Sequence, residues 1–431
     1  MILQKNLPFK LERTTEEITA RSGLAIYTEF LNRLGLNTLI NDQLPRPGSN
    51  RGYQPWHYIK PLLLMLYGGG RHIEDLREIR EDKALRTLIS LKKFPSPSSV
   101  GDWLVRMGNG KGLTGLKQVN WKVVQEILDR EQQNEYTLWI DATLIESEKA
   151  EAKMSYKGVK GYQPLLAGLK EVPLILEHEF REGNESPGAG NFEFLEKCLA
   201  VLPAGKRIKH FSSDSAAYQA EVINLCGEKG ITFTIAADQD AAVKALIKQI
   251  PQAEWVVFKD KDGEVTDREI AETIHTMNKT KAAFRLIVLR WRNPQLDLFN
   301  PNEYCYRAIA TNLTGSPSEV VWEYNARGEF ENYIKELKNG FGMEQLPSGD
   351  LGGNAFWFSL AVLAYNTAVA QKLFLLPPEW WRKTISTLRW SLVETAGKVI
   401  RHGRVLVLKL AAGLEKFNLY LEMRRRCQAL A

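Results

Sequence analysis

Apolar side chains recur at helical spacing through the first third of the chain. Within residues 14–135 they form two clear runs, one at Leu24, Tyr27, Phe30, Leu31 and Leu34, and another at Ile59, Leu62, Leu63 and Leu66. A period of three to four residues predicts amphipathic helices. The first third of the chain is therefore predicted to be helical.

Short polar breaks separate these helices. They lie at 44–52, 68–70 and 94–99. In the last break, Ser98 or Ser99 is a suitable N-cap for a helix that begins near Val100. Several short helices joined by tight turns are typical of a helix-turn-helix DNA-binding domain, and also of a plain helical accessory domain.

The pattern changes near Tyr136, where short runs rich in β-branched and aromatic residues begin. We predict strands in YTLWIDATLIES, GYQPLLAGL, VPLILEHEF, RIKHFSSD and ITFTIAAD. Helical patterns in FEFLEKCLAVL and AAYQAEVINLCGEKG fall between the later strands. Three strands followed by helix, strand, helix and strand is the order of a ribonuclease-H-like core, so the predicted fold class is α/β.

Residues 241–322 contain further strand-like runs, namely WVVFKD, AAFRLIVLRW, EYCYRAIATN and EVVWEY. They predict a β-strand-rich insertion in the core or an extension of its sheet. From Arg327 the pattern is mostly helical again, apart from a strand-like RVLVLKL at 404–410.

These patterns divide the chain into five predicted parts. They are a helical DNA-binding domain (1–135), the first part of the ribonuclease-H-like core (136–240), the β-rich insertion (241–322), a helix that completes the core (323–350) and a basic, mostly helical C-terminal region (351–431).

The most apolar stretch of the chain, Ala355–Leu376, is interrupted by polar side chains at Ser359, Asn366, Thr367, Gln371 and Lys372. We predict a buried helix there rather than a membrane span. The four cysteines contain no CxxC pair, and the N-terminus lacks the apolar core of a signal peptide. The sequence thus favours a soluble protein of a reducing, intracellular compartment.

The net charge of +6 hides an uneven distribution. Residues 1–135 carry a net +5, residues 136–350 a net −7 and residues 351–431 a net +8. An acidic centre between basic ends suggests a cation-binding centre flanked by surfaces that bind a polyanion.

Two carboxylates stand out in the acidic centre. Asp141 lies in an otherwise apolar strand, where a carboxylate charge costs several kcal/mol unless it is paired, solvated or bound to a metal. Asp214 stands at the end of the predicted strand RIKHFSSD. In α/β sheets such strand ends line the ligand crevice. Asp214 alone could equally be a helix N-cap.

A third carboxylate could come from the helix YNARGEFENYIKELKNGFG. At about 100° per residue, its side chains Tyr324, Arg327, Glu331 and Lys338 project within roughly 60° of one face. Gly328 weakens the predicted helix near its start, where Tyr324 lies. The face also fits a solvated surface with an i,i+4 ion pair between Arg327 and Glu331.

Three acidic side chains of this kind suit phosphoryl transfer with two Mg²⁺ ions. Asp and Glu provide the hard oxygen ligands that Mg²⁺ prefers. One ion activates the attacking oxygen and the other stabilises the leaving oxygen. Arginine and lysine beside them would hold phosphates.

The spacing Tyr324, Arg327, Glu331, Lys338 resembles the Tyr-Arg-Glu-Lys signature of insertion-sequence transposases of the DDE type. The wider match is similar to the group numbered thirteen-eighty, within the broader group numbered four. WIDATLIE and FSSDSAAY resemble the segments that carry the first and second Asp of that group, and the resemblance covers nearly the whole chain.

The resemblance implies site residues and partners. Asp141, Asp214 and Glu331 would be catalytic ligands of two Mg²⁺ ions, with Mn²⁺ as a substitute, and Tyr324, Arg327 and Lys338 would contact transposon-end DNA. The expected partners are terminal inverted repeats, target DNA and at least one further copy of the chain, with no membrane. The expected location is the cytoplasm of a prokaryote, in association with the nucleoid.

The function predicted from the sequence is cut-and-paste DNA transposition. The enzyme would hydrolyse the transposon ends and join the freed 3′-hydroxyls to target DNA, and excision through a DNA hairpin is carried over from related transposases. Two alternatives stay open. One is a catalytically silent end-binding repressor, and the other is a nuclease of the same fold that cuts without joining.

Overall fold

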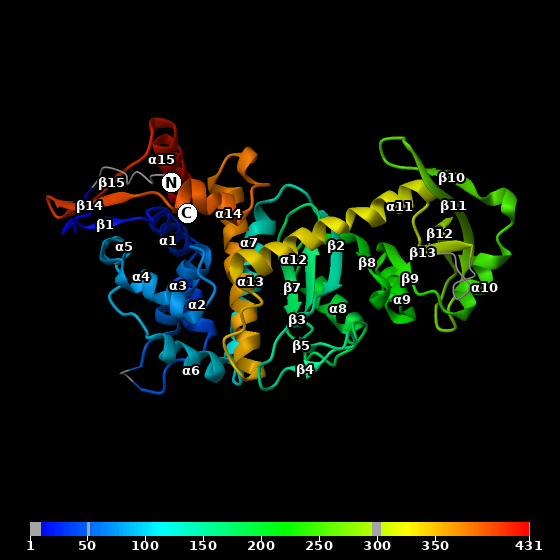
Figure 1. Cartoon of the computed structure of the whole chain (residues 1–431), viewed down its shortest axis with the longest axis horizontal. Coiled ribbons are helices and arrows are strands. Elements are labelled where there is room, and N and C mark those ends of the chain that lie inside the picture. The colour runs from blue at the N-terminus through cyan, green and yellow to red at the C-terminus, as the bar shows by residue number, and fades with distance from the viewer. Residues whose placement is uncertain (1–9, 50–51, 295–302, 431) are drawn as a thin grey trace, which may run out of the picture.

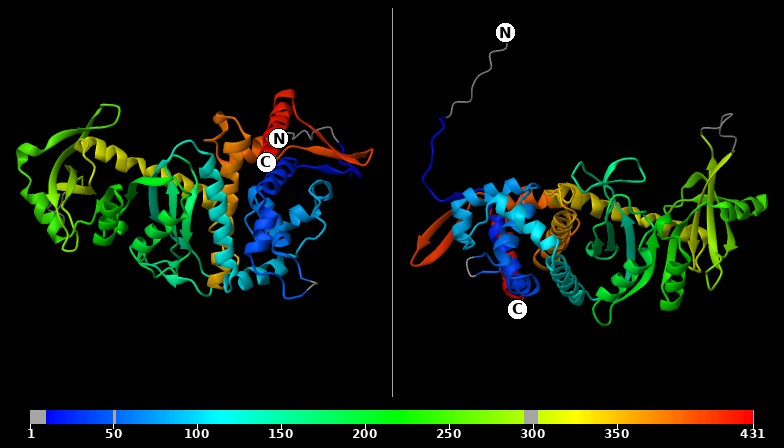
Figure 2. Two further views of the ribbon diagram at one scale, coloured as in Figure 1. Left: turned by 180° about the vertical axis from the view of Figure 1, so that it is seen from behind. Right: turned by 90° about the horizontal axis from the view of Figure 1, so that it is seen from below.

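The computed structural model describes residues 10–49, 52–294 and 303–430. The molecule is elongated, and its parts lie in a row (Figures 1 and 2). A helical part stands at one end, a large sheet occupies the centre, and the outer strands of that sheet form the other end (Figure 1). The C-terminal helix α15 (Leu414–Gln428) contacts α1 (Gly23–Arg33), so both ends of the described chain belong to the helical part.

The helical part agrees with the predicted pattern. After a two-residue strand, β1 (Ile18–Thr19), and α1, it contains α2 (Leu36–Gln43), α3 (Pro55–Tyr67), η1 (Ile73–Asp75), α4 (Leu76–Glu81), α5 (Lys83–Leu88), α6 (Pro97–Gly108) and α7 (Gly112–Arg130). The predicted cap of α6 was wrong by two residues or more. Ser96 is the N-cap, since its Oγ accepts a hydrogen bond from Ser99 N (3.2 Å), and Pro97 occupies the first helical position, where its missing N–H costs nothing.

The central sheet has nine strands in the order β10-β11-β12-β13-β9-β8-β2-β6-β7. Their bounds are β2 (Glu135–Ala142), β6 (Leu165–Leu169), β7 (Ile175–Glu179), β8 (Arg207–Ser213), β9 (Thr232–Ala237), β10 (Val256–Lys259), β11 (Val265–His275), β12 (Phe284–Arg292) and β13 (Tyr304–Thr311). β2 pairs antiparallel with β6 and parallel with β8, which in turn pairs parallel with β9. β13 pairs antiparallel with β9, so the strands of residues 241–322 extend the same sheet.

Three shorter helices accompany these strands. They are α8 (Asn191–Val201), α9 (Ala220–Lys229) and α10 (Ala241–Gln249). A small sheet pairs β3 (Ile145–Glu146), β5 (Lys160–Tyr162) and β4 (Lys153–Met154).

The strand predicted in EVVWEY is wrong. These residues lie in α11 (Pro317–Ala326). The cause is local, because Ser316 and Glu319 form a reciprocal capping box and Pro317 occupies the first turn. The apolar side chains Val320, Val321 and Tyr324 are buried on the side of this helix that faces the sheet.

A long apolar helix joins the central sheet to the helical part. α13 (Leu351–Leu375) contacts α3, α6 and α7 of the helical part, and also α12 (Gly328–Phe341) and β7. It is the single helix among the described residues that is long and apolar enough to cross a membrane, but 89% of its apolar 18-residue stretch is buried in the protein. The prediction of a buried helix is therefore confirmed.

The C-terminal residues complete the helical part. α14 (Ile385–Leu388) and a π-helical turn, η5 (Arg389–Val393), precede a hairpin of β14 (Gly397–His402) and β15 (Val405–Leu410). β14 pairs with β1, which joins the two ends of the chain in one small sheet.

The ammonium group of Lys60 is buried in the helical part, where its Nζ donates a hydrogen bond to Ile89 O (2.8 Å). Burial lowers the pKa of Lys60 from 10.5 to about 8. Between pH 8 and pH 10.5 this lysine binds more proton in the unfolded chain than in the folded one. It therefore makes the free energy of unfolding rise with pH, by at most about 1.4 kcal/mol per pH unit. Urea unfolding should therefore show wild type gaining stability relative to Lys60→Met as pH rises above 8.

The exposed Lys92 provides the control for this prediction, because Lys92→Met removes a charge that is already solvated. Stability curves of wild type and Lys60→Met that run parallel over this range would contradict a buried charge at Lys60.

Candidate active site

Asp141 and Asp214 occupy equivalent positions at the ends of two neighbouring parallel strands. The register of β2 and β8 pairs Ile140 with Ser213, and the next residues are Asp141, still within β2, and Asp214, directly after the end of β8. Because neighbouring strands lie about 4.8 Å apart and alternate their side chains in step, both carboxylates emerge on one face. Ser213 Oγ donates to Ile140 O (3.0 Å) and ties the two strands together at this point.

The electrostatics of Asp141 reflect its position. Burial raises the pKa of Asp141 to about 6, the nearby Asp214 charge adds to the rise, and the Arg327 guanidinium opposes it. Two carboxylates close enough to repel each other form a natural site for a cation.

Asp214 also caps the short helix η2 (Ser215–Ala217), since its Oδ1 accepts a hydrogen bond from Ala216 N (3.1 Å). The helix-cap interpretation of Asp214 is thus correct, and it coexists with the proximity to Asp141. The cap fixes the carboxylate at the end of β8.

Arg327 joins these strands to the helices above the sheet. It lies between α11 and α12, and its Nη1 is 3.2 Å from Asp141 Oδ2. Burial acts to lower the pKa of Arg327, but the nearby Asp141, Tyr324 and Asp214 outweigh it and raise that pKa. The cation that neutralises Asp141 in this structure is therefore a side chain of the same chain.

Glu331 is not part of this cluster. It is exposed on the first turn of α12, and within the described parts of the chain its carboxylate has no hydrogen-bond or ion-pair partner. No group of three or more His, Cys, Asp or Glu that could hold a metal ion is found in residues 10–49, 52–294 and 303–430. The structure thus brings Asp141 and Asp214 together and leaves the third predicted carboxylate outside.

Lys338 and Tyr324 lie on different helices, Lys338 in the last turn of α12 and Tyr324 near the C-terminal end of α11. Lys338 Nζ, on α12, donates to Leu144 O (2.8 Å) just after β2 and is 3.7 Å from Glu344 Oε2. Tyr324 lies on α11, and its ring stacks with Arg307 at 4.4 Å and with Arg327 at 5.9 Å. Arg307, on β13, is the neighbour that the sequence pattern did not reveal.

α12 is held against the sheet by an aromatic contact. The rings of Phe330 and Tyr333 each lie 6.1 Å from the ring of Trp139 on β2. On β6, Gly168 leaves the room for Phe330, because a Cβ at that position would lie 2.3 Å from the phenyl ring. This contact sets the height of α12 above the two aspartates.

Replacing Gly168 by Ala should therefore displace α12. Phe330 is fully buried and has little room to move, so we expect a loss of about 1 to 3 kcal/mol in the free energy of unfolding. Urea unfolding measures it. Gly227→Ala in α9, where a Cβ meets nothing within 4 Å, is the control and should be neutral or slightly stabilising. Equal stabilities of the two variants would contradict this packing.

The comparison with protein families decides the identity of the chain. Residues 3–431 match the family described as transposase DDE domain group 1. The chain belongs to this family of DDE transposases. No curated protein matches this transposase.

Ten chains of solved structures match this transposase. One of them is a cryo-EM structure of a piggyBac transposase synaptic complex with hairpin DNA, at 12% sequence identity and a TM-score of 0.40. That match covers 86% of this chain and 80% of the other.

The donor chemistry of this transposase fits a divalent metal in part. Asp141 and Asp214 offer hard oxygen ligands on one face, and their mutual repulsion is relieved by a cation. Arg327 occupies part of that position, and Glu331 is not within the cluster. Two of the three predicted ligands therefore fit a metal as they stand.

Proposed function

We propose that this DDE transposase carries out cut-and-paste transposition of an insertion sequence, by metal-dependent cleavage at its terminal inverted repeats. The observation that carries the proposal is the pairing of Asp141 and Asp214 at the ends of adjacent parallel strands. Membership of the DDE transposase family supports it. The finer assignment, to the group numbered thirteen-eighty with its Tyr-Arg-Glu-Lys signature, belongs to the same proposal.

The proposed catalytic core is ribonuclease-H-like. Its support is the strand order β7-β6-β2-β8-β9, in which three antiparallel strands are followed by two parallel ones. The β-rich segment that follows would be the insertion, and the helical part would bind DNA.

In the proposed site, Asp141, Asp214 and Glu331 would hold Mg²⁺, for which Mn²⁺ would substitute. When bound, the metal pair would activate the attacking oxygen and stabilise the leaving oxygen at phosphorus. Arg327, Lys338 and Tyr324 bind and orient the DNA backbone beside the carboxylates. Glu331 has to approach the aspartates, and Arg327 has to release Asp141 to a phosphate, as the complex assembles.

The proposed assembly contains at least two copies of the chain, since two transposon ends have to be cut in concert. Its partners would be terminal inverted repeats and target DNA, and it would act in the cytoplasm of a prokaryote, at the nucleoid.

Incubation of the full chain with duplex DNA from the ends of its element, with Mg²⁺ or with a chelator, tests the proposal. The expected result is Mg²⁺-dependent nicking at the ends, followed by joining of the 3′-hydroxyls to a second DNA. Cleavage without joining would identify a nuclease, and tight binding without cleavage would identify an end-binding repressor.

A further inference from the structure

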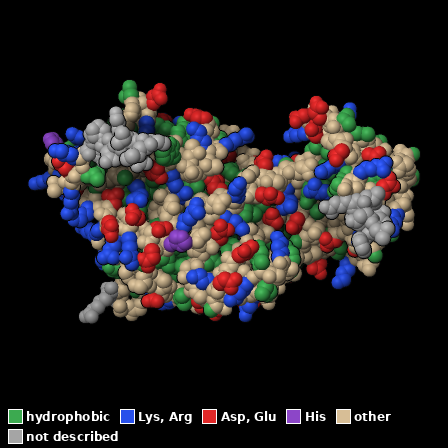
Figure 3. Space-filling view, in the orientation of Figure 1, with side chains coloured by type: hydrophobic (Ala, Val, Ile, Leu, Met, Phe, Trp, Pro, Cys, Tyr) green, Lys and Arg blue, Asp and Glu red, His purple; other side chains and the backbone are tan. Residues whose placement is uncertain are grey.

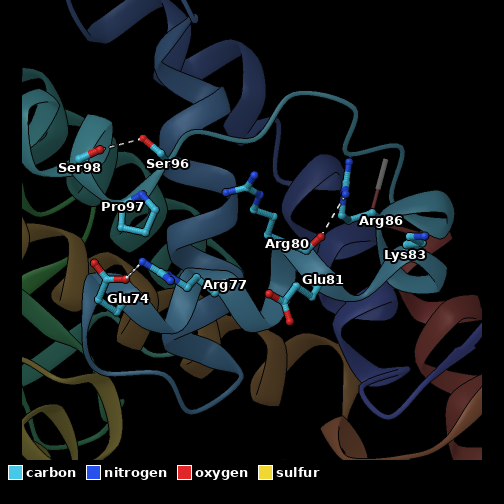
Figure 4. Close-up of a pocket in the computed structure, with 9 residues that line it drawn as sticks. All are labelled: Glu74, Arg77, Arg80, Glu81, Lys83, Arg86, Ser96, Pro97 and Ser98. Atoms are coloured by element: carbon cyan, nitrogen blue, oxygen red, sulfur yellow. Dashed lines mark hydrogen bonds and ion pairs between the residues drawn. The ribbon is translucent and has the colours of Figure 1, made fainter. Parts of the chain in front are cut away.

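A basic cavity of about 620 Å³ lies in the helical part, and none of the predicted catalytic residues lines it. It is formed by α4, α5 and the start of α6, and its lining residues are Glu74, Arg77, Arg80, Glu81, Lys83, Arg86, Ser96, Pro97 and Ser98 (Figure 4). Four of these side chains are basic and two are acidic, a net of two positive charges. Lys and Arg side chains gather on the same face in Figure 3.

Two of the four basic side chains of this cavity have partners within the fold, and two have none among the described residues. Arg77 pairs with Glu74 (2.8 Å), and Arg86 Nη1 donates to Arg80 O (3.0 Å). Arg80 and Lys83 are exposed, and within the described residues neither side chain has a hydrogen-bond or ion-pair partner. Two free cations at the mouth of a cavity are suited to an anion such as a phosphate.

α6 presents a polar face beside the cavity. Its buried side packs through Val100, Trp103, Leu104 and Met107, and its exposed positions Ser98, Asp102 and Arg106 are four residues apart. Residues at this spacing lie on one face of a helix. At 1.5 Å per residue the 12 residues of α6 span about 18 Å, enough to cross the major groove of DNA, which is about 12 Å wide.

A second basic cavity, of about 360 Å³, lies at the other end of α6, where Arg106 and Lys111 are among its lining residues. The exposed face of α6 therefore runs from one basic cavity to another. In a DNA duplex the phosphates of the two strands lie on either side of the major groove, just as the two basic cavities lie at the two ends of the exposed face of α6. Asp102, midway along the face, suits the amino group of a cytosine rather than a phosphate.

We propose that the cavity between α4, α5 and α6 binds backbone phosphates of a DNA duplex and thereby places α6 in its major groove, with Ser98, Asp102 and Arg106 facing the bases. This inference rests on the proposed function, since it assigns the surface by which the transposase recognises its DNA. Phosphate contacts set the position, and base-edge contacts set the sequence preference.

The test uses the full-length chain, a random-sequence DNA duplex and fluorescence anisotropy over a range of salt concentrations. The double variant Arg80→Ala, Lys83→Ala should bind at least about tenfold more weakly at low salt, and the slope of log K against log salt should become less negative by about 2. The matched control is Lys244→Ala, Lys248→Ala, which removes two exposed lysines from α10. Unchanged binding by the first variant, or an equal loss in the control, would overturn the proposal.

Two further measurements test the placement of α6. Asp102→Ala should keep its affinity but select a less restricted set of sequences from a random duplex pool. A-form RNA duplex should compete poorly, because its major groove is too narrow for a helix. An unchanged selected sequence, or equal competition by RNA, would refute the groove contact.

The two proposals fail separately. If the double variant loses DNA binding while wild type never cleaves DNA, the binding surface stands and the proposed activity falls. If wild type cleaves transposon ends and the double variant binds and cleaves like it, the activity stands and the binding surface falls.

Discussion

Replacing Asp141 or Asp214 by Asn should lower Mg²⁺-dependent DNA cleavage by more than about 100-fold. Loss of a group one shell further from a metal already costs 10- to 100-fold, and these two carboxylates are proposed as direct ligands. Asn keeps the size of Asp and removes the charge that Arg327 now neutralises. DNA binding through the helical part should remain, which anisotropy measures alongside the cleavage assay.

The chain offers matched controls for this prediction. Asp262→Asn changes an exposed carboxylate in the turn between β10 and β11 and should leave cleavage unchanged. Glu331→Gln should lose activity, whereas Glu329→Gln, on the same exposed first turn of α12, should retain it. If Asp141→Asn or Asp214→Asn cleaved DNA as well as wild type does, the assignment of the aspartate pair as metal ligands would be wrong.

Replacing Arg389 by Ala should destabilise the protein by about 3 to 5 kcal/mol. Its buried guanidinium donates to Tyr67 O (2.8 Å), Leu66 O (2.6 Å) and Gly340 O (2.5 Å). These carbonyls belong to the last turns of α3 and α12, which lack partners within their own helices. The variant would leave Tyr67 O and Gly340 O without a donor, since Leu66 O also accepts from Gly69 N (3.3 Å), and would remove a cation from two helix C-termini.

Urea unfolding followed by tryptophan fluorescence measures this loss. Arg389→Lys should be intermediate, because one ammonium group cannot reproduce the planar fork of the guanidinium. Arg401→Ala, on the exposed β14–β15 hairpin, is the control and should change stability by less than about 0.5 kcal/mol. A similar stability for Arg389→Ala and Arg401→Ala would contradict the capping role.

Sequence patterns anticipated the strands of the central sheet because their apolar runs are short and buried. They missed β11, which has few apolar residues and three consecutive charged ones at 267–269, and whose partner strands are known only from the fold. They misassigned EVVWEY because β-branched side chains outweighed a capping box at Ser316 that is visible in the sequence. Local capping decided that case against residue propensity.

The candidate site was anticipated to the extent that it depends on strand ends. Asp141 and Asp214 could be paired because parallel strands end at the same side of a sheet. The ion pair between Asp141 and Arg327 could not be predicted, since it depends on how α12 lies across the sheet. That placement is set by the packing of Phe330 over Gly168. Glu331 shares its helix with Arg327 but is exposed, so helical spacing alone did not give its distance from the aspartates.

The pairing of β13 with β9 has a consequence for solubility. Their backbones pair at four positions, from Thr234 with Thr311 to Ala237 with Ala308. A shortened chain without residues 241–322 would end its sheet at β9 and expose a row of bare N–H and C=O groups. Such an edge is a template for aggregation. The added strands thus also protect the edge of the sheet on which Asp141 and Asp214 stand.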